Sequence, residues 1–462
     1  MPMKRAIKVI LFCLIFTILF GKVYRILSWK DTAGDYYSAM DSFYKLEENT
    51  VDVLFLGSSH CYCSINNALL WDKYGMSSFN LAISGQDLAG SYYCFKEALK
   101  TQKPKVVCLE VYGAVHGGYG IQGNIYRNTL PFRTSWNSYQ AINSIVEEER
   151  LNYYLKWPIV HTRYREIKKK DFNKEFPAYL GYHAVFETCH VGELVPYYGD
   201  ELIQLDKELE EWIYKIIKLG EETDTELCFF VAPSTASTEE QKKYKYVEKI
   251  ATEKGIPFLN FIGLEGQLGL DPASDFIDGM HTNHYGAEKV TSYMGEFLCG
   301  EYELSSHWGD KKYDIWEENS LVRAREVMNY SLQMCGELSE YLKQILILQD
   351  YTLIISVDGE VDAEYLKSLG LSDSISKHGG VGIIENGMTI YSNTNEEFSQ
   401  FIDLAGNGLQ VMRDKGQISI LVDTKECCKV DNGVNIVIYD KRLDKIVDVV
   451  GFETWQQYIA IR

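Results

Sequence analysis

Two short segments, far apart in the chain, carry residue types that could perform nucleophilic chemistry. The first is 57-GSSH-60, which directly follows the apolar run 51–56. In the second, Asp278 and His281 stand three residues apart. A carboxylate can hold one tautomer of a histidine, and that histidine can take the proton of a serine hydroxyl such as Ser59. Serine and aspartate are also common helix caps, so each segment alone leaves a structural interpretation open.

The elements around these segments alternate between strand and helix patterns. Strands are predicted at 51–56, 79–86, 104–112, 226–233 and 256–261, and helices at 64–74, 89–102, 201–223, 238–255 and 286–298. Strands separated by helices predict a parallel sheet covered on both faces. The carboxyl ends of such strands share one edge, where Ser59 could meet His281.

The predicted fold class is α/β, a three-layer domain with a parallel sheet, followed by a smaller C-terminal α+β domain rich in strands. The length of 462 residues fits two or three domains. The predicted boundaries are a membrane anchor at 1–30, the parallel-sheet domain at 48–300 with an insertion at about 113–200, a helical linker at 301–345 and the C-terminal domain at 346–462.

Composition narrows the function classes. The net charge of −19 argues against a nucleic-acid binder, which needs basic patches for phosphate. The eleven cysteines show no CxxC pair with metal-ligand spacing, and no His/Cys cluster suggests a metal. We therefore predict neither a cofactor nor a metal.

The N-terminus carries the apolar segment 6–27, with Lys4, Arg5 and Lys8 near its start. Its apolar core, 9–21, is short for a span, but flanking lysines can snorkel to the membrane interfaces. No small-x-small cleavage site follows the core, which favours an uncleaved anchor over a signal peptide. Basic residues on both sides leave the orientation open.

Taken together, the motifs resemble the SGNH/GDSL hydrolase superfamily, whose pattern is GDS, N-x-x-x-x-G, GxND and DxxH. Its second block corresponds to 80-NLAISG-85. The resemblance spans roughly 50–300 and implies that Ser59 is the nucleophile, His281 the general base and Asp278 its orienting carboxylate. It also implies an oxyanion hole at Gly85 and a substrate contact at Asn80.

The chain departs from the family pattern at two places. Ser58 stands where the pattern has the Asp of GDS, and the third block is replaced by 110-EVYG-113. The family's side-chain oxyanion donor is therefore unassigned. Asn124 or Asn128, both in the insertion, could replace it.

The N-terminal anchor and the basic segment 157–172 narrow the resemblance to the membrane-anchored branch that acylates cell-surface polymers. That branch is similar to the D-alanyl-lipoteichoic acid protein and alginate acetylation proteins, which often work beside a membrane-bound O-acyltransferase. His161 and Arg163 are predicted to contact an anionic substrate, because arginine binds carboxylate or phosphate bidentately. The alternative is a solvated basic helix paired with nearby glutamates.

The C-terminal domain resembles the interleukin-like EMT-inducer domain family. The resemblance rests on 432-NGVNIVIYDKRLDKIVDVVGFETW-455 and covers about 345–457. It implies an accessory module that binds sugar or a partner. The alternative is a plain β-hairpin with its turn at 441–444.

The function predicted from the sequence is serine-dependent acyl transfer on a cell-surface glycan, by an O-acetyl esterase or an O-acyltransferase. The predicted location is the cell membrane, with the catalytic domain outside the cytoplasm. The alternative is a catalytically silent, membrane-anchored adaptor that binds a glycan or a membrane-bound O-acyltransferase.

Overall fold

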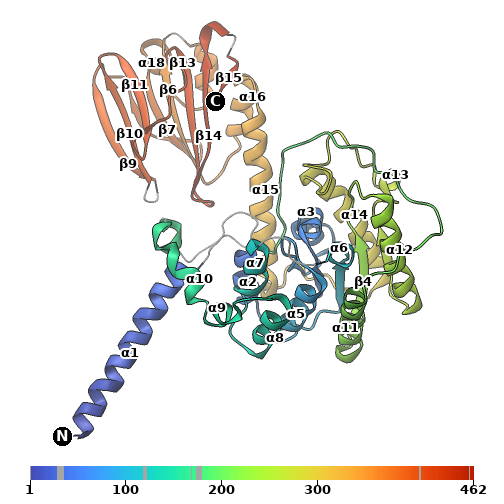
Figure 1. Ribbon diagram of the computed structural model, residues 1–462. Helices are drawn as coiled ribbons and strands as arrows, with labels where there is room; N and C mark the ends of the chain where they lie inside the picture. The colour runs from blue at the N-terminus through green and yellow to red at the C-terminus, as the bar shows by residue number, and fades with distance from the viewer. Residues whose placement is uncertain are drawn as a thin grey trace. The chain divides into compact units, whose positions relative to one another are not determined.

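The computed structural model describes residues 2–28, 36–117, 122–167, 169–172, 179–359, 361–404, 407–456 and 458–462. The chain divides into two compact units, Met1–Leu321 and Val322–Arg462 (Figure 1). The finer domain boundaries predicted from the sequence stay predictions.

The first unit contains a five-stranded sheet in the order β2-β1-β3-β4-β5, and every pair of neighbours is parallel. Its strands are β1 (Val53–Leu56), β2 (Ser78–Asn80), β3 (Val106–Glu110), β4 (Glu226–Val231) and β5 (Phe258–Asn260). The predicted α/β class with a parallel sheet is confirmed. The predicted strand 79–86 is too long, because β2 ends at Asn80 and the chain turns through Gly85, whose φ is +62°.

Alternate residues of the strands face opposite sides of this sheet, as a strand period of two requires. Leu54, Val107 and Phe229 belong to one apolar cluster, whereas Phe55 and Cys108 belong to another. Because both faces are buried, the strands are continuous apolar runs.

Two sets of helices cover the two faces (Figure 1). The cluster of Phe55 contains residues of α3 (Ser59–Ser64), α4 (Asn67–Tyr74) and α14 (His284–Glu301). The cluster of Leu54 contains residues of α2 (Tyr36–Phe43), α5 (Leu88–Ala98), α11 (Lys207–Thr223) and α12 (Thr238–Glu253). The unit also contains α13 (Glu265–Leu268), the 3-10 turn η3 (Lys311–Tyr313) and the first part of α15 (Asp314–Met334).

The insertion is more regular than predicted. It contains α6 (Tyr112–His116), α7 (Gln122–Thr129), α8 (Trp136–Ile145), α9 (Arg150–Leu155), α10 (Trp157–Val160) and the 3-10 turns η1 (His161–Arg165) and η2 (Lys169–Phe172). A capping box between Ser135 and Ser138 starts α8. A small apolar cluster that includes Leu130, Ile142 and Tyr153 holds the segment together. The Gly, Asn and aromatic residues of 117–137 predict irregular structure, and this prediction is wrong where α7 and the start of α8 form.

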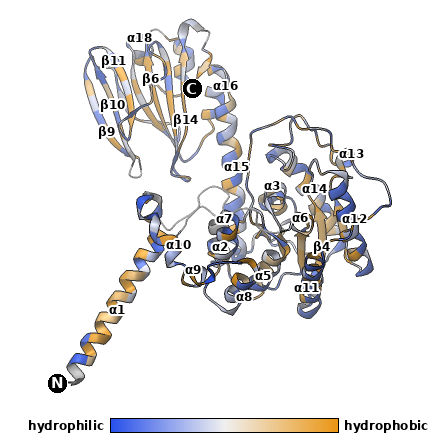
Figure 2. Ribbon diagram, viewed as in Figure 1, coloured by the Kyte–Doolittle hydropathy of each residue, from blue (hydrophilic) through white to orange (hydrophobic). Residues whose placement is uncertain are grey.

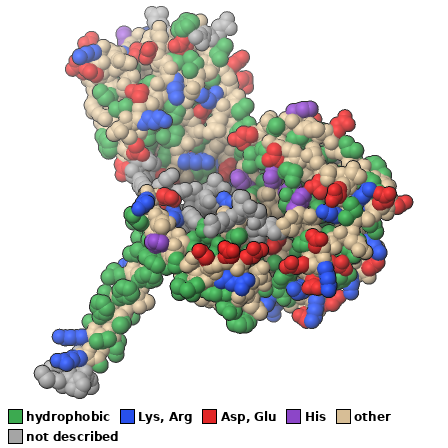
Figure 3. Space-filling model, in the orientation of Figure 1, with side chains coloured by type: hydrophobic (Ala, Val, Ile, Leu, Met, Phe, Trp, Pro, Cys, Tyr) green, Lys and Arg blue, Asp and Glu red, His purple; other side chains and the backbone are tan. Residues whose placement is uncertain are grey.

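Helix α1 (Pro2–Leu27) is apolar along most of its length (Figure 2). Its segment Arg5–Leu27 is long and apolar enough to cross a membrane, a property that an anchor and a signal sequence share. Lys and Arg side chains cluster near its N-terminal end and hydrophobic ones follow (Figure 3).

The second unit packs two antiparallel sheets face to face, in the orders β15-β14-β13-β6-β7-β8 and β12-β11-β10-β9. The rest of α15 and α16 (Leu338–Ile345) contribute to the core on the other face of the larger sheet. The remaining elements are β6 (Tyr351–Asp358), α17 (Ala363–Lys367), α18 (Asp373–His378), β7 (Gly380–Glu385), β8 (Met388–Asn393), β9 (Phe398–Leu404), β10 (Asn407–Asp414), β11 (Gln417–Val422), β12 (Lys425–Glu426), β13 (Gly433–Asp440), β14 (Lys445–Glu453), η4 (Thr454–Gln456) and β15 (Ala460–Ile461). A separate unit rich in strands is confirmed, and its likeness to the interleukin-like EMT-inducer domain stays a prediction.

Candidate active site

The three residues predicted to form a catalytic triad lie together in hydrogen-bonding distance. Nε2 of His281 is 2.7 Å from Oγ of Ser59, although 222 residues separate them. Nδ1 of the same ring is 3.0 Å from each carboxylate oxygen of Asp278. This is the order of contacts in which a histidine takes a serine proton while a carboxylate holds its tautomer.

The loop that carries Asp278 fixes the carboxylate with backbone donors. The amides of Met280 and His281 both donate to Oδ1 of Asp278, at 2.7 and 2.9 Å. Partial burial raises the pKa of Asp278, but these bonds and the His281 ring outweigh burial and leave the pKa below its ordinary value. Asp278 is therefore ionised across the neutral range and can stabilise an imidazolium.

Hydrogen bonds join the segment that follows Ser59 to the segment that follows His281, and they fix the two motifs relative to each other. Thr282 donates to the carbonyl of Cys63 in α3, at 3.1 Å. Thr291 in α14 donates to the carbonyl of Ser64 and accepts from the amide of Asn66. The His281 loop is thus tied to α3, the helix that begins at Ser59.

The turn before Ser59 is built on Gly57, Ser58 and Glu110. Gly57 has a φ of +141°, and a Cβ there would lie 2.6 Å from Cβ of Glu110, so only glycine fits. Ser58 caps α3, because its Oγ accepts from the amide of His60. The hydroxyl and the amide of Ser58 both donate to Oε2 of Glu110, at 2.8 and 3.1 Å. Glu110 therefore holds the turn that precedes Ser59.

Glu110 is a buried acid, and burial raises its pKa to about 7 against the opposing hydrogen bonds from Ser58 and Tyr112. Its stabilising contribution is complete below the ordinary pKa of 4.5 and is lost as the pH rises through about 7. The difference between these two pKa values corresponds to roughly 3 kcal/mol in the free energy of unfolding.

We expect the Tm of the wild-type protein to fall between pH 5 and pH 8, and the Glu110→Gln variant to show a smaller fall, both measured on the full chain in detergent. An unchanged fall in the variant would contradict this assignment.

A side-chain amide lies over the predicted oxyanion glycine. A Cβ at Gly85 would stand 2.1 Å from Nδ2 of Asn124, which comes from α7 in the insertion. Oδ1 of Asn124 faces Nη1 of Arg127 at 3.4 Å, which leaves the NH2 group directed at Gly85. Asn128 is buried instead, and its amide donates to the carbonyls of Ser84 and Asn124. Of the two candidates from the sequence, Asn124 has the geometry of a donor.

Two further side chains shape the site and were not predicted. Tyr62 follows Ser59 by three residues in α3. Burial raises the pKa of Tyr62 to about 12, and the nearby Arg127 charge opposes that rise. His60 packs its ring edgewise on His281, with centroids 5.0 Å apart. Burial, aided by the charges of His281 and His116, lowers the pKa of His60 to about 3, so its ring is neutral.

The three predicted substrate contacts lie in other settings. Asn80 is fully buried, and its amide bonds to the backbone of Cys61 and Ala82. Arg163 is also buried and binds main-chain carbonyls at the end of α1. The bonds of Asn80 and Arg163 give both residues structural roles. His161 is exposed, and its ring bonds to carbonyls of the turn just before it, so a substrate role for His161 stays a prediction.

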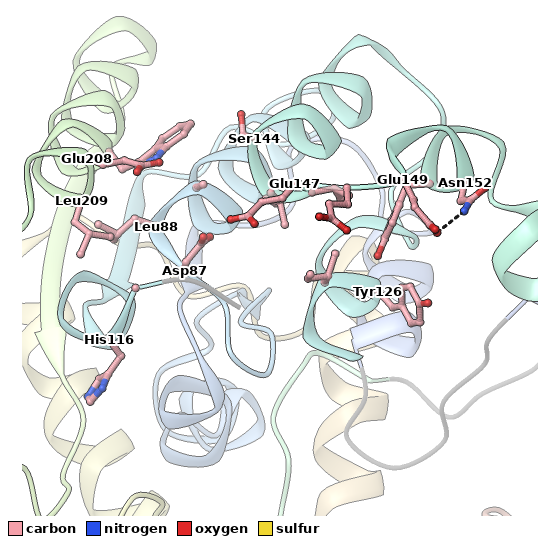
Figure 4. Close-up of a pocket in the computed structure, with 18 of the residues that line it drawn as sticks. Asp87, Leu88, His116, Tyr126, Ser144, Glu147, Glu149, Asn152, Glu208 and Leu209 are labelled. Carbon is pink, nitrogen blue, oxygen red and sulfur yellow. Dashed lines mark hydrogen bonds between the residues drawn. The ribbon is translucent and has the colours of Figure 1, made fainter. Parts of the chain in front are cut away.

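A large cavity of about 1010 Å³ lies beside α7 but contains none of the triad residues (Figure 4). Asp87, Glu147, Glu149 and Glu208 line it, which makes it acidic. This cavity is therefore separate from the cluster of Ser59, His281 and Asp278. Among the residues that the structure describes, no group of three or more His, Cys, Asp or Glu side chains could hold a metal.

No protein-family model matches the chain, and no curated protein matches it. Solved structures that resemble it include a candidate lipolytic protein of the G-D-S-L family from Desulfitobacterium hafniense DCB-2, at 12% identity and a TM-score of 0.30, covering 54% of this chain and 100% of that one. A candidate acylhydrolase from Bacteroides fragilis NCTC 9343 has 9% identity and a TM-score of 0.30, covering 59% and 99%. A candidate GDSL-like lipase from Parabacteroides merdae ATCC 43184 has 14% identity and a TM-score of 0.28, covering 55% and 97%. At these values the likenesses say nothing further about this chain, and its chemistry rests on its own geometry.

Proposed function

We propose that this protein is a serine-dependent esterase or O-acyltransferase. The contact of 2.7 Å between Ser59 Oγ and His281 Nε2, with Asp278 on the other ring nitrogen, carries the proposal. A serine within reach of an oriented histidine is the arrangement that activates a hydroxyl for attack on an ester.

In the first half-reaction, Ser59 Oγ attacks the ester carbonyl and its proton passes to Nε2 of His281. The tetrahedral intermediate collapses, the bond to the leaving oxygen breaks, and His281 returns the proton to that oxygen. The acyl group is then an ester on Ser59. In the second half-reaction, a water or sugar hydroxyl gives its proton to His281 and attacks the acyl carbon. The bond from that carbon to Ser59 Oγ then breaks, and His281 returns the proton to Oγ.

The oxyanion of both tetrahedral states would be held by the backbone amides of Ser59 and Gly85 and by the side-chain amide of Asn124. No hydrogen bond from either backbone amide occurs within the described part of the chain. The placement of Asn124 over Gly85 supports its role as the third donor. Preorganised donors of this kind commonly supply the largest electrostatic contribution to such reactions.

The proposed acceptor is a hydroxyl of a cell-surface glycan. In this proposal α1 anchors the protein in the membrane, and the catalytic unit lies on its outer side. The apolar helix and the resemblance noted in the sequence support this assignment. An associated membrane-bound O-acyltransferase would be the natural source of the acyl group. If water accepts the acyl group instead, the protein is an esterase that hydrolyses the acyl ester.

A fluorophosphonate probe tests the nucleophile directly, because it phosphonylates only an activated serine. We expect one adduct on the full chain, located at Ser59 by peptide mass spectrometry, and none on the His281→Ala variant. Absence of an adduct on the folded wild-type protein would favour the silent adaptor.

A further inference from the structure

The C-terminal end of α1 is held by a buried arginine of the insertion. Nη1 of Arg163 donates to the carbonyls of Leu27 and Ser28, at 3.0 and 2.6 Å. These carbonyls belong to the last turn, which has no partners inside its own helix. Asp171 in η2 holds the other guanidinium nitrogen at 3.0 Å. The end of α1 is therefore clamped to η1 and η2.

A second contact lies further down the helix, within its apolar part. The rings of Phe20 and Trp157 stand 4.9 Å apart between centroids. Phe20 precedes Leu27 by seven residues, which is about 10 Å along a helix that rises ~1.5 Å per residue. If α1 crosses a bilayer, Trp157 must reach the depth at which the hydrocarbon begins. Tryptophan is enriched at that depth.

The neighbours of Trp157 expose large apolar side chains to solvent. Leu151 and Leu155 of α9 are 65% and 59% exposed, and Tyr164 and Phe172 are 57% and 60% exposed. With Trp157 they form what we call the interfacial platform. Isolated apolar side chains on a surface need no explanation, but several beside the exit of a span indicate a membrane contact.

Nearby charges fit the same orientation. Arg165 of η1 is exposed, and Lys22 and Arg25 are in the last turns of α1. Basic side chains at this level are favourable beside lipid phosphates.

We propose that the interfacial platform inserts into the boundary between headgroups and acyl chains of the bilayer that α1 crosses. The inference rests on the proposed membrane anchoring, and it is independent of the proposed esterase chemistry. The catalytic unit would then lie on the membrane surface, instead of hanging from a flexible tether, and would act on substrates close to the bilayer.

Photo-crosslinking of the full chain in phosphatidylethanolamine–phosphatidylglycerol vesicles tests this contact. A benzoylphenylalanine would replace Leu155 or Tyr164 in the platform, Phe16 in α1, or Tyr198, which is 82% exposed in the same unit. We expect lipid adducts, read by mass spectrometry, at Phe16, Leu155 and Tyr164, each at least tenfold above the Tyr198 position.

Two results would overturn the proposal, and they differ in meaning. Adducts at Phe16 with no excess at Leu155 and Tyr164 would show an anchored protein whose platform stays in water. No adduct at Phe16 would show that α1 lies outside the bilayer, and the platform would lose its basis. Fluorophosphonate labelling of Ser59 in the same vesicles reports on the chemistry separately, so failure of either proposal is visible alone.

Discussion

Replacing Ser59 by alanine is expected to remove hydrolysis of p-nitrophenyl acetate by the full chain almost completely, with kcat falling by about 10⁴ or more. The only hydroxyl within 2.7 Å of His281 Nε2 in the described contacts is that of Ser59, so no neighbouring group can take over the attack. His281→Ala should cost about as much. The double variant should lose no more than either single one, because nucleophile and base act as a unit.

Ser58→Ala is the matched control, since the sequence places two serines side by side. The Ser58 hydroxyl bonds to Glu110 and caps α3, so its loss should cost about 1 kcal/mol of stability and less than tenfold in kcat. If Ser58→Ala were the inactive variant and Ser59→Ala an active one, the nucleophile would be misassigned.

Asn124→Ala is expected to lower kcat by about 10² to 10³ while KM changes little, which is the usual cost of removing one oxyanion donor. The donor acts on charge that develops only in the transition state, so the loss falls on kcat. Initial rates with p-nitrophenyl acetate over a range of concentrations separate the two constants. A loss of less than threefold would exclude Asn124 from the oxyanion hole.

Gly85→Ala provides an independent check on the same amide. The new Cβ would occupy the space 2.1 Å from Asn124 Nδ2 and displace it, and alanine would also be strained at a φ of +62°. We expect the double variant to lose less kcat than the product of the fold-losses of Gly85→Ala and Asn124→Ala. Full multiplication in the double-mutant cycle would show that the two positions act separately.

The sequence was sufficient to predict the parallel sheet and that Ser59, His281 and Asp278 lie close together, for a physical reason. Buried strands are continuous apolar runs, Ser59 follows one of them closely, and His281 stands in a short motif just before the helix α14. Asn124 could not be selected over Asn128 from the sequence, because α7 lies in an insertion without periodic apolar signals. The role of Arg163 depended on the end of α1, which is 136 residues away, and no local pattern carries that information.

Ser58 and Glu110 have a consequence for how relatives of this protein can be found. An aspartate at position 58 would set a second carboxylate against Oε2 of Glu110, and two such groups at that distance must share one proton. The serine in the first motif and the glutamate at the end of the third strand are thus expected to vary together in an alignment. A search pattern that treats the two positions independently counts Ser58 and Glu110 as two separate mismatches. A pattern that treats them as a pair would accept the combination of serine and glutamate.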